Sequence, residues 1–243
     1  MNASKPTLDL AKKQRPSKKI SVNMRATGWI SPYLIYFFSR YSIPPNLITF
    51  SWIILAFVGF YFIALGNYIY AVIGILIYHL ALLLDSTDGG VARILGKTNA
   101  GGEFLDRFFS TINRSLILFA MGFGLFRIRG EILFLYLGIW SAVFIFLDNF
   151  VKLKNYEALA NSGRLDLVKD NVKKMKNAKK GIKFYIIELF RPGNHFTLSF
   201  FAIIFALVDI YLYIFSIIIF LQFLYSFFDI FIYLKNTSQK RPK

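Results

Sequence analysis

The chain has 243 residues, of which 56% are hydrophobic, 19% aromatic and 17% charged, and it contains no cysteine. This composition lies outside the range of soluble domains and excludes disulfides and thiolate metal sites. The formal net charge of +16 does not indicate nucleic-acid binding, because Lys and Arg gather between long uncharged apolar stretches, as they do in membrane proteins.

The N-terminal segment, residues 1–25, is basic and polar and leads into no short apolar run with a cleavage site. A signal peptide is therefore not expected, and we predict a disordered cytosolic arm that contacts anionic membrane lipid. Over residues 26–42, apolar residues from Trp29 onward recur at helical spacing, interrupted by Pro32 and Arg40. This pattern predicts an amphipathic interfacial helix that lies along the bilayer.

The rest of the chain contains six apolar stretches that could each cross a bilayer, which takes roughly 20 residues. They are Asn46–Leu65, Ile69–Leu84, Phe104–Phe126, Ile132–Val151, Phe196–Val208 and Ile210–Leu234. The fifth is short unless it begins near Phe184. We therefore predict an all-α integral membrane protein. Its parts are a six-helix membrane domain over residues 43–235, with a basic cytosolic loop at 152–183, and a basic tail at 236–243.

The distribution of positive charge predicts the orientation of these spans. Lys and Arg gather in the N-terminal arm, between Lys152 and Arg191, and in the C-terminal tail. The connections on the opposite side hold only Arg127 and Arg129. Because positively charged loops stay in the cytosol, both termini and the segment 85–110 are expected to face the cytoplasm.

Three acidic residues flank the second cytosolic loop. Asp85 and Asp88 end the second apolar stretch at i,i+3 spacing, on one helical face, and Asp106 begins the third stretch. An antiparallel hairpin can bring the three together, and clustered carboxylates repel unless a cation neutralises them. Oxygen ligands suit Mg²⁺ or Mn²⁺, often with substrate phosphates. The residues alone thus indicate a divalent cation and a phosphorylated ligand, without choosing a reaction.

Small and basic residues accompany these acids. Gly89 and Gly102 let backbone or ligand approach closely, and Arg93 can bind a carboxylate or a phosphate with two parallel hydrogen bonds. Merely solvated acids, the usual interpretation of a single carboxylate near a membrane, do not explain this coincidence. A channel or transporter would need acids along a pore, whereas these gather at one end of the spans.

The spacing over residues 85–110, D-x2-D-G-x2-A-R-x8-G-x3-D-x3-S, resembles the motif of the CDP-alcohol phosphotransferases, also called CDP-alcohol phosphatidyltransferases. The family has aspartate at the position of Ser110. The segment PNLIT at residues 45–49 resembles the P-N-x-x-T element that opens the first span of these enzymes. The resemblance implies a membrane-embedded, homodimeric transferase in phospholipid biosynthesis. It would move a phosphoalcohol group from a CDP-alcohol, such as CDP-diacylglycerol or a CDP-polyol, to an acceptor alcohol or lipid and release CMP.

The resemblance also implies a role for each matching residue. The carboxylates of Asp85, Asp88 and Asp106 would hold two divalent ions, Mg²⁺ or Mn²⁺, on the CDP diphosphate, with Asp106 among the catalytic residues. Donor binding is implied for Asn46, Thr49, Asp85, Gly89, Ala92, Arg93 and Gly102. Acceptor binding is assigned by location to Arg114, Lys152, Lys183 and Arg191, each of which could equally be an interfacial anchor.

Ser110 stands where the family has its catalytic base. A serine hydroxyl is no general base near neutral pH. The loss of a carboxylate at this position also weakens the binding of a second metal ion. Three explanations stay open: a divergent active enzyme, a catalytically impaired or inactive member that binds CDP-alcohol or lipid without turnover, and an introduced inactivating change. The candidate substitute bases are Glu103, His79, His195 and Asp148, and for His79 a hydrogen-bonded core histidine is the favoured interpretation.

Overall fold

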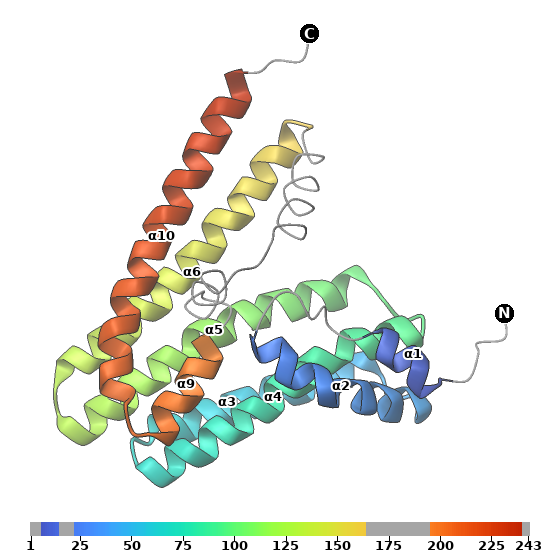
Figure 1. Ribbon diagram of the computed structural model, residues 1–243, viewed down its shortest axis with the longest axis horizontal. Coiled ribbons are helices and arrows are strands. Elements are labelled where there is room, and N and C mark those ends of the chain that lie inside the picture. Colours follow the sequence, from blue (N-terminus) through green and yellow to red (C-terminus); the bar gives the residue numbers. More distant parts are fainter. Residues whose placement is uncertain (1–5, 15–21, 164–194, 240–243) are drawn as a thin grey trace.

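The computed structural model describes residues 6–14, 22–163 and 195–239. Within these ranges the chain forms helices and no strand (Figure 1), which confirms the all-α prediction. Five helices are long and apolar enough to cross a membrane, as expected of a multi-pass integral membrane protein. These are α3 (Pro45–Ala64), α4 (Tyr68–Ile94), α5 (Ala100–Arg129), α6 (Ile132–Asn161) and α10 (Val208–Gln239).

Two features of the spans differ from the sequence-based boundaries. The fifth predicted stretch, Phe196–Val208, is represented by α9 (His195–Ile204), which ends four residues before the predicted boundary. Its predicted earlier start near Phe184 lies outside the described residues. Helix α6 continues to Asn161, so residues 152–161, expected to begin the basic loop, extend the fourth predicted span instead.

The N-terminal segment also departs from the expectation of a disordered arm, because residues 8–13 form a short helix, α1 (Leu8–Lys13). The hydroxyl oxygen of Thr7 caps it by accepting a hydrogen bond from the backbone nitrogen of Leu10 at 3.3 Å. Ala11 is fully buried in a small apolar cluster with residues of α3 and α4 and of the helix that follows α1.

Helix α2 (Val22–Arg40) follows and contains Pro32 without a break. Its buried face packs on α4 at the point where Gly90 provides space. A Cβ atom on Gly90 would lie 2.5 Å from the Cδ1 of Ile35. The opposite face exposes a row of aromatic side chains, which are Trp29, Tyr33, Phe37 and Tyr41. Such a face suits a helix at a membrane boundary, and the interfacial position stays a prediction.

Two pairs of consecutive spans, α3 with α4 and α5 with α6, form antiparallel hairpins joined by tight turns. Gly66 turns the chain between α3 and α4 with φ +83°, and the side chain of Asn67 then caps α4. Gly130 ends α5 in the left-handed conformation, φ +71°, before α6 begins. Helices α6 and α10 run side by side and diverge from the group formed by α2, α3 and α4 (Figure 1).

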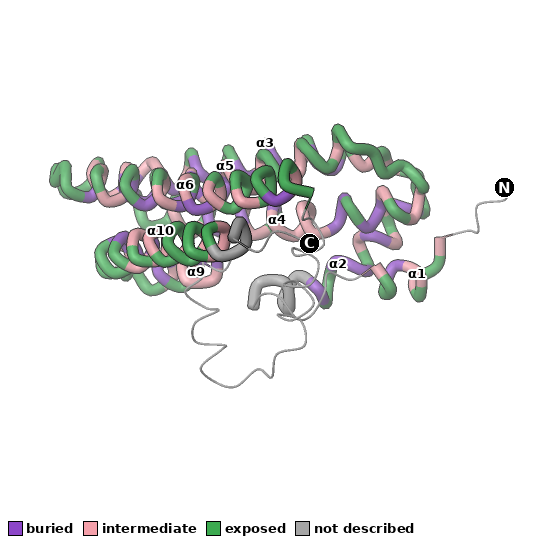
Figure 2. The backbone as a smooth tube through the Cα atoms, turned by 90° about the horizontal axis from the view of Figure 1, so that it is seen from above, coloured by how far each residue is buried: buried purple, intermediate pink, exposed green. Residues whose placement is uncertain are grey.

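One core joins the spanning helices. Buried apolar side chains from α3, α4, α5, α6, α9 and α10 form a single cluster that includes Trp52, Tyr78, Met121, Ile145, Ile203 and Phe215. Figure 2 shows that each helix places only part of its surface inward and leaves the rest exposed. Large apolar residues such as Ile54, Tyr136 and Ile217 lie on the surface, with 61%, 60% and 62% of their area exposed. An outward apolar surface of this extent fits a lipid environment.

We expect Gly122→Val to destabilise the α5–α6 hairpin. A Cβ atom at Gly122 would lie 2.5 Å from the carbonyl oxygen of Phe134 and 2.8 Å from the Cα of Gly138, and backbone atoms cannot rotate away. The expected loss is about 1–3 kcal/mol, as for other overpacked cores, seen as a lower apparent melting temperature in detergent. Gly28→Ala is the control, because no atom of the described residues lies within 4 Å of a Cβ at Gly28. Equal melting temperatures for the two variants would contradict the prediction.

Candidate active site

The residues of the 85–110 motif come together where α4 ends and α5 begins. Asp85, Asp88 and Arg93 lie in the last turns of α4, the chain turns through residues 95–99, and Asn99 caps α5 by accepting a hydrogen bond from the nitrogen of Gly102 at 2.6 Å. Helix α5 packs closely on α3 and α6 rather than along α4. At this point the contact between α4 and α5 is therefore made by polar side chains and not by closely packed apolar ones.

Asp85 is the centre of this group. Its Oδ1 accepts a hydrogen bond from the Oγ of Ser110 at 3.3 Å, across 25 residues of sequence. Its carboxyl group is also close enough to that of Asp106 for the two groups to interact electrostatically. All three side chains are half-buried. Two carboxylates at this separation repel strongly in a partly apolar site unless a proton or a cation lies between them.

Asp88 is oriented differently, toward α3. Its Oδ2 accepts two hydrogen bonds, from Thr49 Oγ1 at 2.8 Å and from Trp52 Nε1 at 3.1 Å. Its Oδ1 lies 2.5 Å from the backbone nitrogen of Gly89, which donates to it. Asp88 is only 6% exposed, and a buried carboxylate needs such partners to offset the loss of water.

The remaining motif residues lie at the same place, where α4 ends and α5 begins. A Cβ atom on Gly102 would lie 3.8 Å from the Asn46 side-chain oxygen, so the PNLIT element and the motif meet in space. The Nη1 of Arg93 lies 3.5 Å from the Cβ position of Gly89, and its Nε donates to the Gln14 side-chain oxygen at 2.6 Å. The short α1 segment therefore reaches the exposed motif arginine.

The chemistry of this donor set fits a divalent cation that is shared with a substrate. Within the described residues no three acidic or histidine side chains form a ready cage, and Asp88 faces Thr49 and Trp52 on α3 while Asp85 and Asp106 meet. Mg²⁺ commonly takes only one or two carboxylates, together with water and substrate phosphates. The Asp85–Asp106 pair could supply two such oxygen ligands.

Comparison with known proteins shows which family the chain belongs to. Residues 42–228 match the CDP-alcohol phosphatidyltransferase family, a match that includes α3 to α6, α9 and most of α10. The chain belongs to this family. It is 37% identical over 89 residues to an uncharacterised protein of Aquifex aeolicus, and 37% identical over 87 residues to the archaetidylinositol phosphate synthase of Aeropyrum pernix.

These two similarities are partial. They include 37% and 36% of this chain, and 44% and 43% of the respective relatives. The chain thus matches less than half the length of the curated relatives. Family membership follows from the longer match, which contains the whole Asp85–Ser110 segment.

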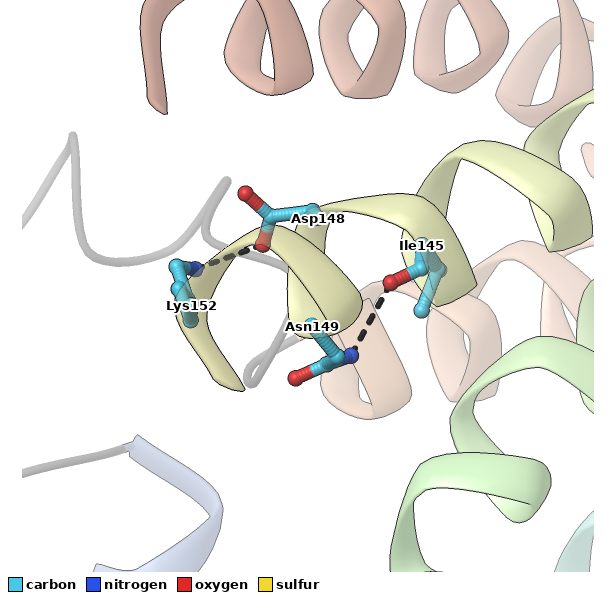
Figure 3. Close-up of polar contacts among 4 residues, drawn as sticks. All are labelled: Ile145, Asp148, Asn149 and Lys152. Carbon is cyan, nitrogen blue, oxygen red and sulfur yellow. Dashed lines mark hydrogen bonds and ion pairs between the residues drawn. The ribbon is translucent and has the colours of Figure 1, made fainter. Parts of the chain in front are cut away.

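For a CDP-alcohol phosphatidyltransferase, the placement of the basic residues predicted to bind an acceptor is informative. Arg114 lies one turn beyond Ser110 and is close enough to Asp85 and Asp106 to interact with both electrostatically. Lys152 instead pairs with Asp148 in α6, Nζ to Oδ2 at 2.5 Å (Figure 3), so its charge is already compensated. The other two candidates, Lys183 and Arg191, lie outside the described residues.

Three of the predicted substitute bases, Glu103, His79 and His195, make contacts with residues other than Ser110. Glu103 is exposed and paired with Arg107 at 2.5 Å. His79 is partly buried with its Nδ1 2.9 Å from the carbonyl oxygen of Ile75, as the interpretation of a hydrogen-bonded core histidine requires. His195 begins α9 and is fully buried beside the rings of Phe196 and Phe215.

Asp148 is the most enclosed acid of the described chain. It is 0% exposed, and within the described residues its Oδ1 has no hydrogen-bond partner, while Oδ2 faces Lys152. Asn149, the next residue, turns to the backbone and donates to the carbonyl oxygen of Ile145 at 2.9 Å (Figure 3). Asp148 thus has an unused acceptor atom but is held by a lysine of its own helix.

Two contacts of this site were missed from the sequence. Trp52 follows Thr49 by three residues, so the shared helical face was a usable signal for its approach to Asp88. Gln14 gave no signal, because a glutamine in a basic N-terminal segment resembles any solvated polar residue. Its contact with Arg93 spans 79 positions and depends on α1 folding back onto α4.

Proposed function

We propose that this family member is a Mg²⁺-dependent transferase that acts on a CDP-alcohol and an acceptor alcohol at the cytosolic membrane face. The acceptor oxygen forms a bond to the β-phosphorus of the donor. The bond from that phosphorus to the oxygen of CMP breaks, and CMP leaves with the electron pair. The proton of the acceptor hydroxyl passes to water or to a neighbouring base. The products are a phosphodiester, which belongs to phospholipid biosynthesis, and CMP.

The side chains on α4 and α5 divide this work. Asp85 and Asp106 would hold a divalent ion, Mg²⁺ or Mn²⁺, and such an ion neutralises charge on the diphosphate. A second ion would bind more weakly, because Ser110 contributes no carboxylate. The one proton of the Ser110 hydroxyl points to Asp85, which leaves its oxygen lone pairs to accept a hydrogen bond from the acceptor hydroxyl. Arg114, beside both acids, is positioned to bind an acceptor phosphate.

The donor nucleotide would bind where α4 ends and α5 begins. At this point Gly102 lies near Asn46, and Gly89 lies near the guanidinium of Arg93. Glycine at both positions leaves room for a ligand, and the exposed guanidinium of Arg93 can bind phosphate. Ala92 follows on the same stretch of α4. These assignments are supported by the match of each residue to the family motif.

The observation that carries the proposal is the hydrogen bond of Ser110 to Asp85, which also interacts electrostatically with Asp106, inside the family match. The test is release of labelled CMP by the purified protein in detergent, with Mg²⁺ and a panel of CDP-activated lipids and polyols. Since one relative is named archaetidylinositol phosphate synthase, an archaeal CDP-activated ether lipid with inositol phosphate belongs in the panel. We expect release that stops when EDTA removes the metal. No release with any pair would contradict the proposal.

A second candidate function is a family member that binds CDP-alcohol or lipid with little or no turnover. One observation favours it: Ser110 places a hydroxyl, not a carboxylate, against Asp85. Binding of a CDP-alcohol by calorimetry, without CMP release over the same panel, would support this candidate over the first.

The cellular setting of the proposal follows from charge. The positive charge of the N-terminal arm, of the segment between Lys152 and Arg191 and of the tail supports a cytosolic position of the Asp85–Ser110 site, next to anionic lipid. A homodimer is expected from the family. Protease protection in sealed vesicles, with cleavage at the N-terminal arm only from the cytosolic side, tests the orientation.

A further inference from the structure

Thr49 and Trp52 form a donor pair on α3 whose hydrogen bonds end at one atom, the Oδ2 of Asp88. The two residues are one helical turn apart and are 7% and 1% exposed, so no water competes for either bond. A carboxylate oxygen has about two lone-pair sites. The Oδ2 of Asp88 is therefore saturated by protein donors.

The other oxygen of Asp88 is less engaged. Oδ1 accepts only the bond from the Gly89 nitrogen among the described residues. It is the oxygen with a lone pair left for a ligand. The donor pair thus makes the two carboxylate oxygens unequal, and it prevents the group from rotating about its Cβ–Cγ bond.

We propose that Thr49 and Trp52 are positioning residues that hold Asp88 so that its Oδ1 is available to a divalent cation. The inference rests on the proposed function and adds Asp88, for which the motif implies metal binding, to Asp85 and Asp106. It changes the role of Thr49, which the family motif suggests for donor binding. The Oγ1 of Thr49 lies 2.8 Å from the Oδ2 of Asp88 and 3.2 Å from the carbonyl oxygen of Pro45, so the shorter hydrogen bond directs the hydroxyl to Asp88. It also assigns a role to Trp52, which no motif includes.

Groups that orient a metal ligand from outside the metal's own contacts are worth about 10–100-fold in metal affinity. We therefore expect Trp52→Phe, which keeps an aromatic ring in the core and removes the N–H donor, to weaken Mn²⁺ binding about tenfold. Thr49→Val, which keeps the shape and removes the hydroxyl, is expected to act similarly. Because both donors address one oxygen, the double variant should lose less than the product of the single losses.

The measurement is titration of the full-length protein in detergent micelles with Mn²⁺ alone, with free Mn²⁺ read by electron paramagnetic resonance. Thr49→Ser, which retains the hydroxyl, should restore affinity to within about twofold, and a purely structural role would not predict this rescue. Trp140→Phe is the matched control, since Trp140 is 46% exposed on α6 and packs on Phe144 and Phe220. It should bind Mn²⁺ as the wild type does.

The outcomes separate this inference from the proposed function. Unchanged Mn²⁺ affinity in Trp52→Phe and Thr49→Val, with binding by the wild type, would overturn the donor pair and leave the transferase proposal intact. A wild type that binds no Mn²⁺ would also overturn the donor pair, whereas CMP release decides the transferase proposal. If Trp52→Phe does not fold, the comparison of Thr49→Val with Thr49→Ser decides the question alone.

Discussion

Ser110→Asp is expected to raise the rate of CMP release by about 10²–10⁴-fold, the usual contribution of a general base. The Oγ of Ser110 lies 3.3 Å from the Oδ1 of Asp85, so a carboxylate introduced there would join the existing acids without rearrangement of α5. It would supply the proton acceptor that the hydroxyl lacks and a further anionic ligand for the second ion. The measurement is the initial rate of CMP release at saturating Mg²⁺ with a fixed donor and acceptor.

Ser110→Asn is the matched control, because asparagine has the shape of aspartate but neither its charge nor its basicity. It should stay at or below the wild-type rate. An active wild type with no gain in Ser110→Asp would show that another group removes the proton. A silent wild type with an active aspartate variant would identify the chain as an impaired member on an intact scaffold.

Asp85→Asn should reduce CMP release by about 10²–10³-fold, the size of effect seen when one preorganised electrostatic group is removed from an active site. Asp85 accepts a hydrogen bond from Ser110 and interacts electrostatically with Asp106. Asparagine keeps the volume of the side chain at this central position and removes its negative charge. The fold should not suffer, because removing one of two close carboxylates relieves their repulsion. Rate and apparent melting temperature are measured on the same preparation.

Asp209→Asn is the control for this substitution. Asp209 begins α10 at the opposite end of the bundle, where its Oδ2 pairs with the Arg129 guanidinium at 2.7 Å. An ion pair that is partly exposed contributes at most about 1 kcal/mol, so activity should be unchanged. Equal loss of activity in the two variants would mean that the effect of Asp85→Asn comes from the fold and not from the site.

Much of the fold was predictable because long apolar stretches have few alternatives in a membrane. The first four predicted spans overlap α3 to α6 and the last overlaps α10, although α4 and α6 each continue ten residues beyond the predicted end. For the fifth stretch the structure describes α9 (His195–Ile204), and the predicted earlier start near Phe184 lies outside the described residues. The short helix α1 was missed because its stability depends on burying Ala11 against other helices, which the local sequence does not reveal.

The candidate site shows the same division. The positions of the acids predicted that Asp85 and Asp106 lie together, and their carboxyl groups are close enough to interact electrostatically. They also predicted one group of three acids, whereas Asp88 turns away to Thr49 and Trp52. Lys152 was chosen for its place near the cytosolic end of the fourth predicted span, and its pairing with Asp148 could have been suspected from the i,i+4 spacing.

The sequence by itself determined the membrane class, the family motif and the absence of the last motif aspartate, because apolar length and residue spacing are properties of the chain alone. Only the tertiary structure decided which side chains meet. The contacts of Asp85 with Ser110 and of Asp88 with Thr49 join residues 25 and 39 positions apart. Such contacts depend on how α3, α4 and α5 pack, and helix packing is governed by the shapes of whole helical faces rather than by any local pattern.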